Sequence, residues 1–335
     1  AAEASSLAKG LYAVQAPSAC RVREDGSLVL EFPEPALQII VGVKEHPLYL
    51  TFEICEIVGR PPAIVLWGPY AAAISGTSGT VGEAVGVVRD GRFALGIQVL
   101  NEKTIGGYPV DLPPCPIAGE YPDAKLEYGA CAAWTSSEGG TLLQAYVRNR
   151  TLPARRKVFG QADIPIEPLS GADAEPTGSR IALFGCPPDE VLSVIEEIEL
   201  GEGLPHPTLE GKWAKTSPEA TQSYLITDFS EETILEAVGY AKAAGFKYLY
   251  HPEPFATWGH FGLSPDLFPN GDDGMRKCVE AAEQEGVRLG VHTLSNFTTR
   301  NDPYVTPVPD GRLQRTGTAR LTSPVGASDA DIPVD

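Results

Sequence analysis

The stretch Tyr248-Leu-Tyr-His-Pro-Glu-Pro-Phe-Ala-Thr-Trp-Gly-His-Phe-Gly262 decides how the rest of this chain is interpreted. The run Phe246 to Tyr250 predicts a buried strand, and polar and aromatic residues follow it directly. A second short run, Arg288 to Val291, is also followed by a histidine. In a parallel (β/α) sheet, the carboxyl ends of neighbouring strands carry the reactive side chains. The pattern therefore predicts a site shared by two adjacent parallel strands.

Helical patterns alternate with these strands. Ser230 is a favourable N-cap for a helix that Gly245 ends, and a second helix is expected from Asp272 or Asp273 to near Gly286. The first helix is expected to bury a stripe made of Ile234, Leu235, Val238 and Ala241. The order helix–strand–helix–strand favours parallel strands with right-handed crossovers.

Residues 1–160 predict a different kind of domain. The turn signals Glu24-Asp-Gly26 and Arg89-Asp-Gly91 indicate hairpins. Strand-like segments recur without a helical period, which favours an antiparallel β-sandwich. These segments are Leu28–Phe32, Leu37–Val43, Leu48–Phe52, Ala63–Trp67, Val85–Val88, Ala94–Leu100 and Leu142–Val147.

The intervening residues 161–222 are interpreted as a linker. They include one helix, Pro187 to Glu199, and one further candidate strand, Ile181 to Phe184. We therefore expect a β-sandwich at 1–160, a linker at 161–222, and the first part of a (β/α)8 barrel at 223–335.

Composition excludes several classes of function. The net charge of −18 argues against nucleic acid and anionic membranes as partners. No apolar run reaches the ~20 residues that span a bilayer, and the six cysteines form no CxxC pair. The chain begins Ala-Ala-Glu-Ala rather than with Met, so we expect a removed leader or tag, or a fragment. The protein is expected to be secreted or periplasmic.

The strand-end stretches supply the candidate site residues. Three of the five histidines lie there. We expect the candidate catalytic residues to converge with His292 on one pocket, because neighbouring strands lie only ~4.8 Å apart. Imidazole beside carboxylate suits a general base or a divalent metal, although no cofactor is required by the sequence. The catalytic candidates are His251, Glu253 and His260, and the substrate-binding candidates are Tyr250, Trp258, His292 and Asn296.

The run from Asp228 to Asn296 resembles the start of the catalytic barrel in the α-galactosidase clan of glycoside hydrolases. The β-rich first half is similar to the sandwich that precedes such barrels. The resemblance implies a (β/α)8 barrel, a carbohydrate substrate and glycosidase activity. Its motifs here are Glu231-Glu-Thr-Ile-Leu-Glu-Ala237, Gly245-Phe246, Phe268-Pro-Asn-Gly271 and Gly286-Val-Arg-Leu-Gly290.

One motif departs from this clan. Where the clan has two acids followed by Gly-Trp, this chain has His251-Pro-Glu-Pro254. The clan's nucleophile and acid lie on later strands, and no residue here matches them. A full barrel needs ~250 residues, so we expect further polypeptide to complete it.

Three functions therefore stay open. The first is a glycoside hydrolase acting on a plant or host polysaccharide or oligosaccharide. The second is a polysaccharide lyase that acts on uronic-acid-containing glycans with a His or Tyr base. The third is a non-catalytic carbohydrate-binding subunit.

Overall fold

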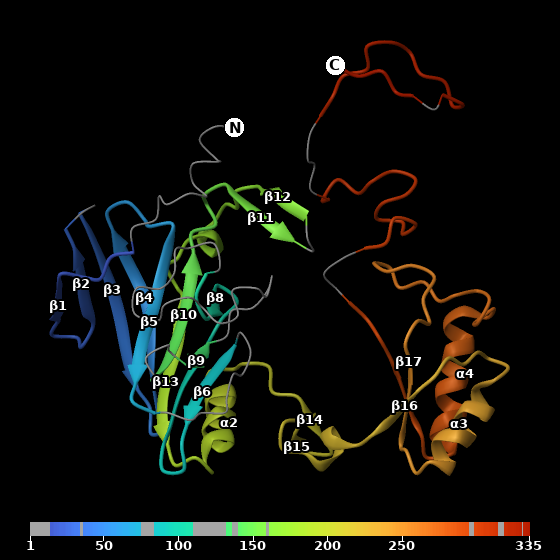
Figure 1. Cartoon of the computed structure of the whole chain (residues 1–335), viewed down its shortest axis with the longest axis horizontal. Coiled ribbons are helices and arrows are strands. Elements are labelled where there is room, and N and C mark those ends of the chain that lie inside the picture. Colours follow the sequence, from blue (N-terminus) through green and yellow to red (C-terminus); the bar gives the residue numbers. More distant parts are fainter. Residues whose placement is uncertain are drawn as a thin grey trace. The chain divides into compact units, whose positions relative to one another are not determined.

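The structure is a computed structural model that describes residues 14–33, 36–74, 84–109, 132–135, 140–158, 161–294, 298–313, 318–329 and 331–335. It contains two compact units, Ala1–Pro207 and Thr208–Asp335 (Figure 1). The first consists mainly of antiparallel strands, and the second contains parallel strands and two helices. The predicted order, an antiparallel β domain followed by a parallel segment with helices, is therefore present.

The first unit is built on a seven-stranded antiparallel sheet. In spatial order the strands are β1 (Ala19–Val22), β2 (Leu28–Phe32), β3 (Leu37–Glu45), β4 (Tyr49–Val58), β13 (Arg180–Cys186), β7 (Ala94–Val99) and β6 (Val85–Arg89). The predicted hairpin turns join β1 to β2 and β6 to β7.

A second antiparallel sheet supplies the other layer. It consists of β5 (Ile64–Ala72), β10 (Thr141–Arg148), β8 (Thr104–Gly106) and β9 (Ala133–Thr135). Ile54 and Ile97 of the first sheet and Ala145 of the second are all fully buried in one apolar cluster. Alternating strand residues meet in this cluster, so the predicted β-sandwich is confirmed.

The segment interpreted as a linker contributes to the sandwich. β13, the candidate strand in that segment, lies between β4 and β7 and pairs with both. It is followed by α2 (Val191–Gly201), and the boundary between the compact units falls after Pro207. The boundary after Pro207 differs from the limits at 160 and 222 that the sequence indicated. The reason is that β13, a strand late in the chain, completes a sheet whose other strands come much earlier.

Short elements occur in both units. Two hairpins are β11 (Ala154–Val158) with β12 (Gln161–Ile166), and β14 (Thr208–Leu209) with β15 (Lys212–Trp213). The single-turn helices are η1 (Ala172–Ala174) and η2 (Pro218–Thr221). The described part of the chain contains no helix long and apolar enough to cross a bilayer.

The second unit contains a three-stranded parallel sheet. Its strands are β16 (Tyr224–Ile226), β17 (Tyr248–His251) and β18 (Arg288–Val291), in that spatial order. β17 pairs with both neighbours in parallel. The expected adjacency of the two organising strands is therefore confirmed, and β16 extends the sheet on the other side.

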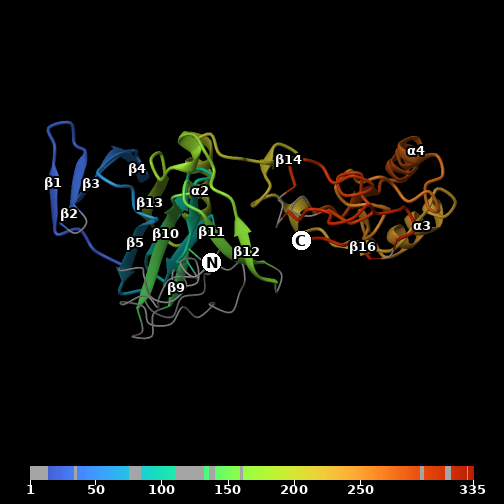
Figure 2. The same ribbon diagram turned by 90° about the horizontal axis from the view of Figure 1, so that it is seen from above.

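Two helices cover one face of this sheet. They are α3 (Ile234–Ala243) and α4 (Gly271–Gln284), and both lie on the same side of the strands (Figures 1 and 2). Ala237 and Val238 of α3 pack with Leu249 of β17 in one buried cluster. Leu235 was expected in the buried stripe but is 64% exposed. The helical period explains this, because a residue directly after Ile234 points about 100° away from it.

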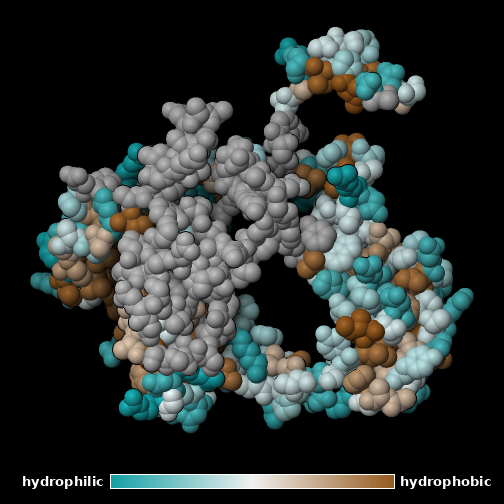
Figure 3. All heavy atoms as spheres, viewed as in Figure 1, coloured by the Kyte–Doolittle hydropathy of each residue, from teal (hydrophilic) through white to brown (hydrophobic). Residues whose placement is uncertain are grey.

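The other face of the sheet is open among the described residues. Tyr224 and Ile226 of β16, which pair with Tyr248 and Tyr250, remain 54% and 56% exposed on this face. Figure 3 shows brown, apolar atoms over this area of the second unit. Parallel sheets are normally covered on both faces, so this unit has one conventional face and one bare face.

Candidate active site

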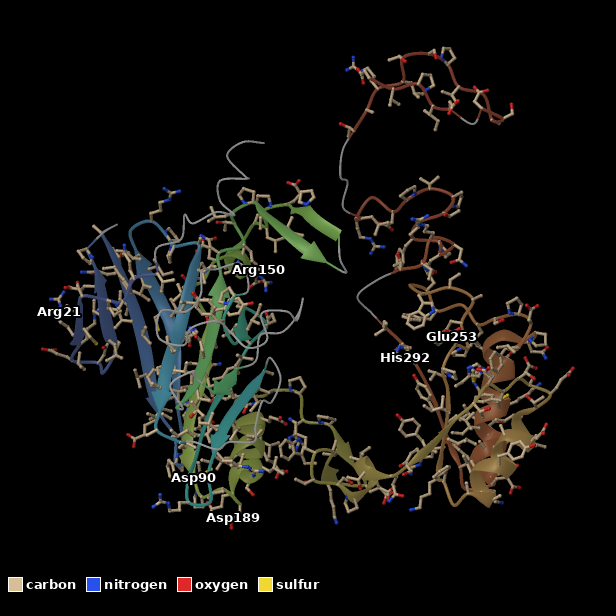
Figure 4. All side chains as sticks on the ribbon, in the orientation of Figure 1. Arg21, Asp90, Arg150, Asp189, Glu253 and His292 are labelled. Atoms are coloured by element: carbon tan, nitrogen blue, oxygen red, sulfur yellow. The ribbon has the colours of Figure 1, made fainter. Side chains whose placement is uncertain are left out.

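Strand register decides which side chains meet at the carboxyl end of the parallel sheet. Tyr250 lies opposite Gly290, and His251 lies opposite Val291. Because strand side chains alternate between faces, Tyr250 and His292 share one face while His251 points to the other. Figure 4 shows His292 and Glu253 beyond the strand ends of the second unit.

His251 lies in the core on the helix-covered face and has no exposed surface. Its Nε2 is 3.0 Å from the Phe229 carbonyl oxygen, to which it donates, and its Nδ1 accepts from the backbone N–H of Glu253 at 3.2 Å. The rings of Phe229 and Phe268 pack against it, at centroid distances of 4.8 and 6.0 Å. Burial lowers the pKa of His251, more than the Phe229 hydrogen bond raises it. This histidine is a neutral packing residue whose two nitrogens are both occupied.

Tyr250, His292 and Trp258 form a group on the opposite face, called here the aromatic group. The His292 ring centroid is 6.3 Å from that of Tyr250 and 5.5 Å from that of Trp258. The interplanar angles of 74° and 61° are edge-to-face arrangements. All three side chains are partly exposed, so each retains some surface that solvent can reach.

His260 lies in the same loop as Trp258 but takes part in a different contact. Its Nδ1 is 2.8 Å from Oδ1 of Asp302, a carboxylate with no exposed surface. Its ring also packs against the Tyr304 ring at an interplanar angle of 33°, with centroids 4.1 Å apart. The His260 side chain remains 48% exposed. One ring nitrogen is thus fixed by a buried anion, while the ring as a whole reaches the surface.

The Asp302 carboxylate is strongly stabilised in its ionised form. Burial raises the pKa of Asp302, but the backbone N–H groups of His260 and Tyr304 together with the His260 ring outweigh it. The pKa of Asp302 therefore lies well below its ordinary value. An ionised carboxylate only accepts hydrogen bonds, so His260 donates through Nδ1–H.

The structure separates residues that the sequence placed in one pocket. Tyr250, Trp258 and His292 lie next to one another, and their role in binding substrate stays a prediction. His251 does not join His292, because the register turns it into the core. The side chain of Glu253 is exposed, and its backbone N–H is what contacts His251.

Two further expectations concern Asn296 and metal ions. Asn296 lies outside the described residues. Among the residues that the structure does describe, no three His, Cys, Asp or Glu side chains are placed to hold one metal ion.

Asp302 and Tyr304 were not singled out from the sequence. They follow Asn301 in a proline-rich segment where regular periodicity fades. The available signal is local, because Asp directly before Pro303 is typical of an ordered turn. That signal predicts a turn but cannot reveal that the carboxylate reaches back to His260.

Comparisons with known proteins find similarity to solved structures. No family model and no curated protein matches the sequence. Among solved structures, the α-galactosidase of Thermus thermophilus, in complex with p-nitrophenyl α-D-galactopyranoside, is similar at 14% identity and a TM-score of 0.37, over 80% of this chain and 49% of that chain. An α-galactosidase from Lactobacillus brevis is similar at 8% identity and a TM-score of 0.34, over 84% of this chain and 40% of that chain.

The GH36 α-galactosidase AgaA from Geobacillus stearothermophilus is similar at 11% identity and a TM-score of 0.32, over 90% of this chain and 44% of that chain. The chain spans less than half the length of each of these three solved structures.

Proposed function

We propose that this chain is part of a secreted or periplasmic glycoside hydrolase that acts on a plant or host polysaccharide or oligosaccharide. The observation that carries the proposal is the aromatic group at the carboxyl end of the parallel sheet. Tyr250 and His292 come from the two strand ends and Trp258 comes from the adjoining loop. This is the edge of a parallel (β/α) sheet where substrates bind.

The chemistry of the aromatic group suits a sugar. A pyranose ring presents an apolar face of C–H groups, which packs on an aromatic ring, and a rim of hydroxyl groups. Tyr250 and His292 carry polar atoms that can bond such hydroxyls, while Trp258 offers the largest apolar face. A mostly apolar lining with a few polar groups is the usual composition of a small-ligand site.

The proposal includes further polypeptide that completes the barrel. Glycoside hydrolysis commonly uses two carboxylates, ~5–5.5 Å apart in retaining enzymes, and we place them on strands beyond β18. The bare face of the present sheet supports this, because Tyr224 and Ile226 are more than half exposed there. An uncovered apolar sheet face and an unpaired strand edge favour association with more chain.

Substitution of Trp258 by alanine tests the sugar site. Titration calorimetry with methyl α-D-galactopyranoside, methyl α-D-glucopyranoside and methyl β-D-galacturonide measures affinity in the native protein and the variant. We expect at least one of these ligands to bind, and Trp258→Ala to weaken that binding about tenfold, which corresponds to ~1.4 kcal/mol. Tyr240→Ala is the matched control, because Tyr240 is an exposed aromatic residue on α3.

The outcomes separate the alternatives. Equal losses in the Trp258 and Tyr240 variants, or unchanged affinity in the Trp258 variant, would remove the aromatic group as the sugar site. Turnover is measured in the full-length enzyme with p-nitrophenyl glycosides and with glycans. New reducing ends whose oxygen comes from isotopically labelled water indicate hydrolysis, whereas binding without any turnover indicates a carbohydrate-binding subunit.

A second candidate, a lyase acting on uronate-containing glycans, is favoured by His260. A lyase needs a base that removes the proton next to the uronate carboxylate, and an exposed imidazole held by a carboxylate is a suitable base. Its product contains a carbon–carbon double bond conjugated with the carboxylate, which absorbs ultraviolet light. If that absorbance appears and no reducing end takes up oxygen from water, the reaction is elimination rather than hydrolysis.

A further inference from the structure

The feature that the aromatic group does not explain is the buried carboxylate of Asp302. It accepts the backbone N–H of His260 at 2.8 Å, the His260 ring nitrogen at 2.8 Å and the backbone N–H of Tyr304 at 2.9 Å. The Thr257 side chain donates as well. A buried carboxylate is costly unless it is well bonded, and here every donor comes from two short loops.

Gly259 makes this approach possible. Its φ is +129°, a backbone conformation that residues other than glycine rarely adopt. A Cβ atom built at this position would lie 2.7 Å from both Cγ and Oδ1 of Asp302. The backbone at 259 is therefore shaped to leave room for the carboxylate, which then reaches the N–H and the ring of the next residue.

The loop that carries His260 is also anchored to the segment that carries Asp302. The backbone N–H of Trp258 donates to Thr299 Oγ1 at 3.0 Å, and the N–H of Thr299 donates to the Trp258 carbonyl at 2.9 Å. Asn301 Nδ2 donates to the Ala256 carbonyl at 3.0 Å. Hydrogen bonds thus join the two loops into one unit. This unit includes Trp258, which is also a member of the aromatic group.

One residue of this unit has an uncommon backbone conformation. Phe261 has a φ of +54°, in the left-handed region, although it is not glycine. Its ring packs against Phe255 at 5.3 Å and Trp258 at 6.1 Å. Residues held in sparsely populated conformations are typical of functional sites, where packing compensates their cost.

The consequence for His260 is a fixed tautomer. Because the Asp302 carboxylate accepts from Nδ1 at 2.8 Å, a neutral His260 ring carries its proton on Nδ1, and in that form the lone pair of Nε2 is available. The ring packs against Tyr304, which fixes its orientation, and the side chain is 48% exposed. A proton acceptor that is oriented by a buried carboxylate is the arrangement used in general acid–base catalysis.

We propose that Asp302 is a positioning residue that holds His260 as a proton acceptor for the sugar chemistry of this site. In the step, Nε2 takes a proton from a water molecule whose oxygen bonds to the anomeric carbon. The bond that breaks joins that carbon to a nucleophile carboxylate of the complete enzyme, as in the second half of retaining hydrolysis, and the carboxylate leaves as an anion that needs no proton. Imidazolium then releases its proton to solvent. This inference rests on the proposed function, but its structural part stands independently.

Nitrogen-15 NMR of the histidine rings tests the structural part without any substrate. In the native chain above neutral pH, we expect the His260 signals to show the Nδ1–H tautomer, assigned by their loss in His260→Gln. Asp302→Asn replaces the acceptor by an amide that presents both donor and acceptor atoms. We expect that variant to lose the pure Nδ1–H signature and to show Nε2–H or a mixture.

The matched control is Thr257→Val. It removes another donor to Asp302 but leaves the His260 contact, so the tautomer is expected to stay Nδ1–H. An Nδ1–H signal that persists in Asp302→Asn, or one that Thr257→Val removes equally, overturns the positioning role.

Turnover in the full-length enzyme tests the chemical part. We expect Asp302→Asn and His260→Gln each to lower kcat about 100-fold, with much smaller changes in KM. Normal kcat in both variants would end the proton-transfer role even where the tautomer result holds. Loss of sugar binding in Trp258→Ala is a separate readout. Failure of the proposed sugar site can therefore be distinguished from failure of the proposed role of Asp302 and His260.

Discussion

His251 and His260 belong to the same strand-end stretch, yet their surroundings are opposite. His251 is fully buried among Phe229 and Phe268, and its two ring nitrogens bond backbone groups. His260 is half exposed, with a buried carboxylate on one nitrogen. The first bonds uncharged backbone groups and loses basicity by burial, whereas the second is oriented by an anion. The comparison teaches that the partner and the face of the sheet, rather than the residue type, decide what a histidine does.

The two faces of the parallel sheet differ in the same way. The helix-covered face buries Leu249 completely, while the other face leaves Ile226 56% exposed. Apolar burial stabilises by about 25 cal/mol per Å² of surface, so stability of the second unit is concentrated on the helix side. The bare side is left available for ligand or for additional chain.

The largest expected effect comes from breaking this difference between faces. Leu249→Ala is expected to destabilise the second unit by ~2–5 kcal/mol, because it leaves a cavity in a closed core. Ile226→Ala, the matched change on the bare face, is expected to cost no more than ~0.5 kcal/mol. Hydrogen exchange of the α3 segment, followed by mass spectrometry in urea, measures both.

Equal losses from the two substitutions would show that the bare face is packed in solution. A loss for Ile226→Ala that occurs only in the full-length enzyme would instead show that further chain covers it. Either result sharpens the proposal that the barrel is completed by additional polypeptide.

A medium effect is expected from pH. Burial lowers the pKa of His251 in the folded state, while the unfolded value is ~6.5. Stability from the neutral ring is therefore fully present above pH ~6.5 and falls as the pH drops towards the folded pKa. Asp228, whose Oδ1 is 3.9 Å from Nδ1, and the Glu253 carboxylate oppose this loss but do not cancel it.

His251→Gln tests that dependence, because glutamine can make both hydrogen bonds but does not titrate. We expect the native second unit to lose stability between pH 7 and pH 5, and the variant to lose clearly less. Urea midpoints at several pH values provide the measurement. Leu235→Ala, an exposed change on α3 that removes no titrating group, is the control and should keep the native slope. A slope that persists unchanged in His251→Gln would reverse the assignment.

The smallest expected effect is the stability cost of His260→Gln at neutral pH. The ring is 48% exposed, and Asp302 retains its backbone donors. We expect ~0.5–1 kcal/mol, the net value of one hydrogen bond, measured as a shift in urea midpoint. A cost as large as that of Leu249→Ala would mean that His260 is a core residue and would contradict its role at the surface.

Much of the fold follows from local patterns that the sequence displays directly. The Gly-containing turns predicted two hairpins, and alternation of apolar residues located β2 to its exact limits, Leu28–Phe32. Helical spacing located α3 and α4, and the order of elements indicated parallel pairing of β17 and β18. These features depend on residues close in the chain, so periodicity and turn chemistry suffice to predict them.

The site depended on longer-range facts. The sequence brought Tyr250, Trp258 and His292 to one edge, but it placed His251 with them because strand ends alone do not reveal register. A one-residue step reverses the face of every side chain, and only the pairing of His251 with Val291 settled it.

Asp302 was beyond sequence reasoning for a related reason. Its contact with His260 joins two irregular loops, and Gly259 admits the carboxylate only through a backbone angle. Irregular loops have no period from which distant contacts can be deduced. The sequence by itself determined the elements and the reactive edge of the sheet. The tertiary structure decided which histidine is buried and which one a buried carboxylate orients, because burial and long-range hydrogen bonds exist only once the chain has folded.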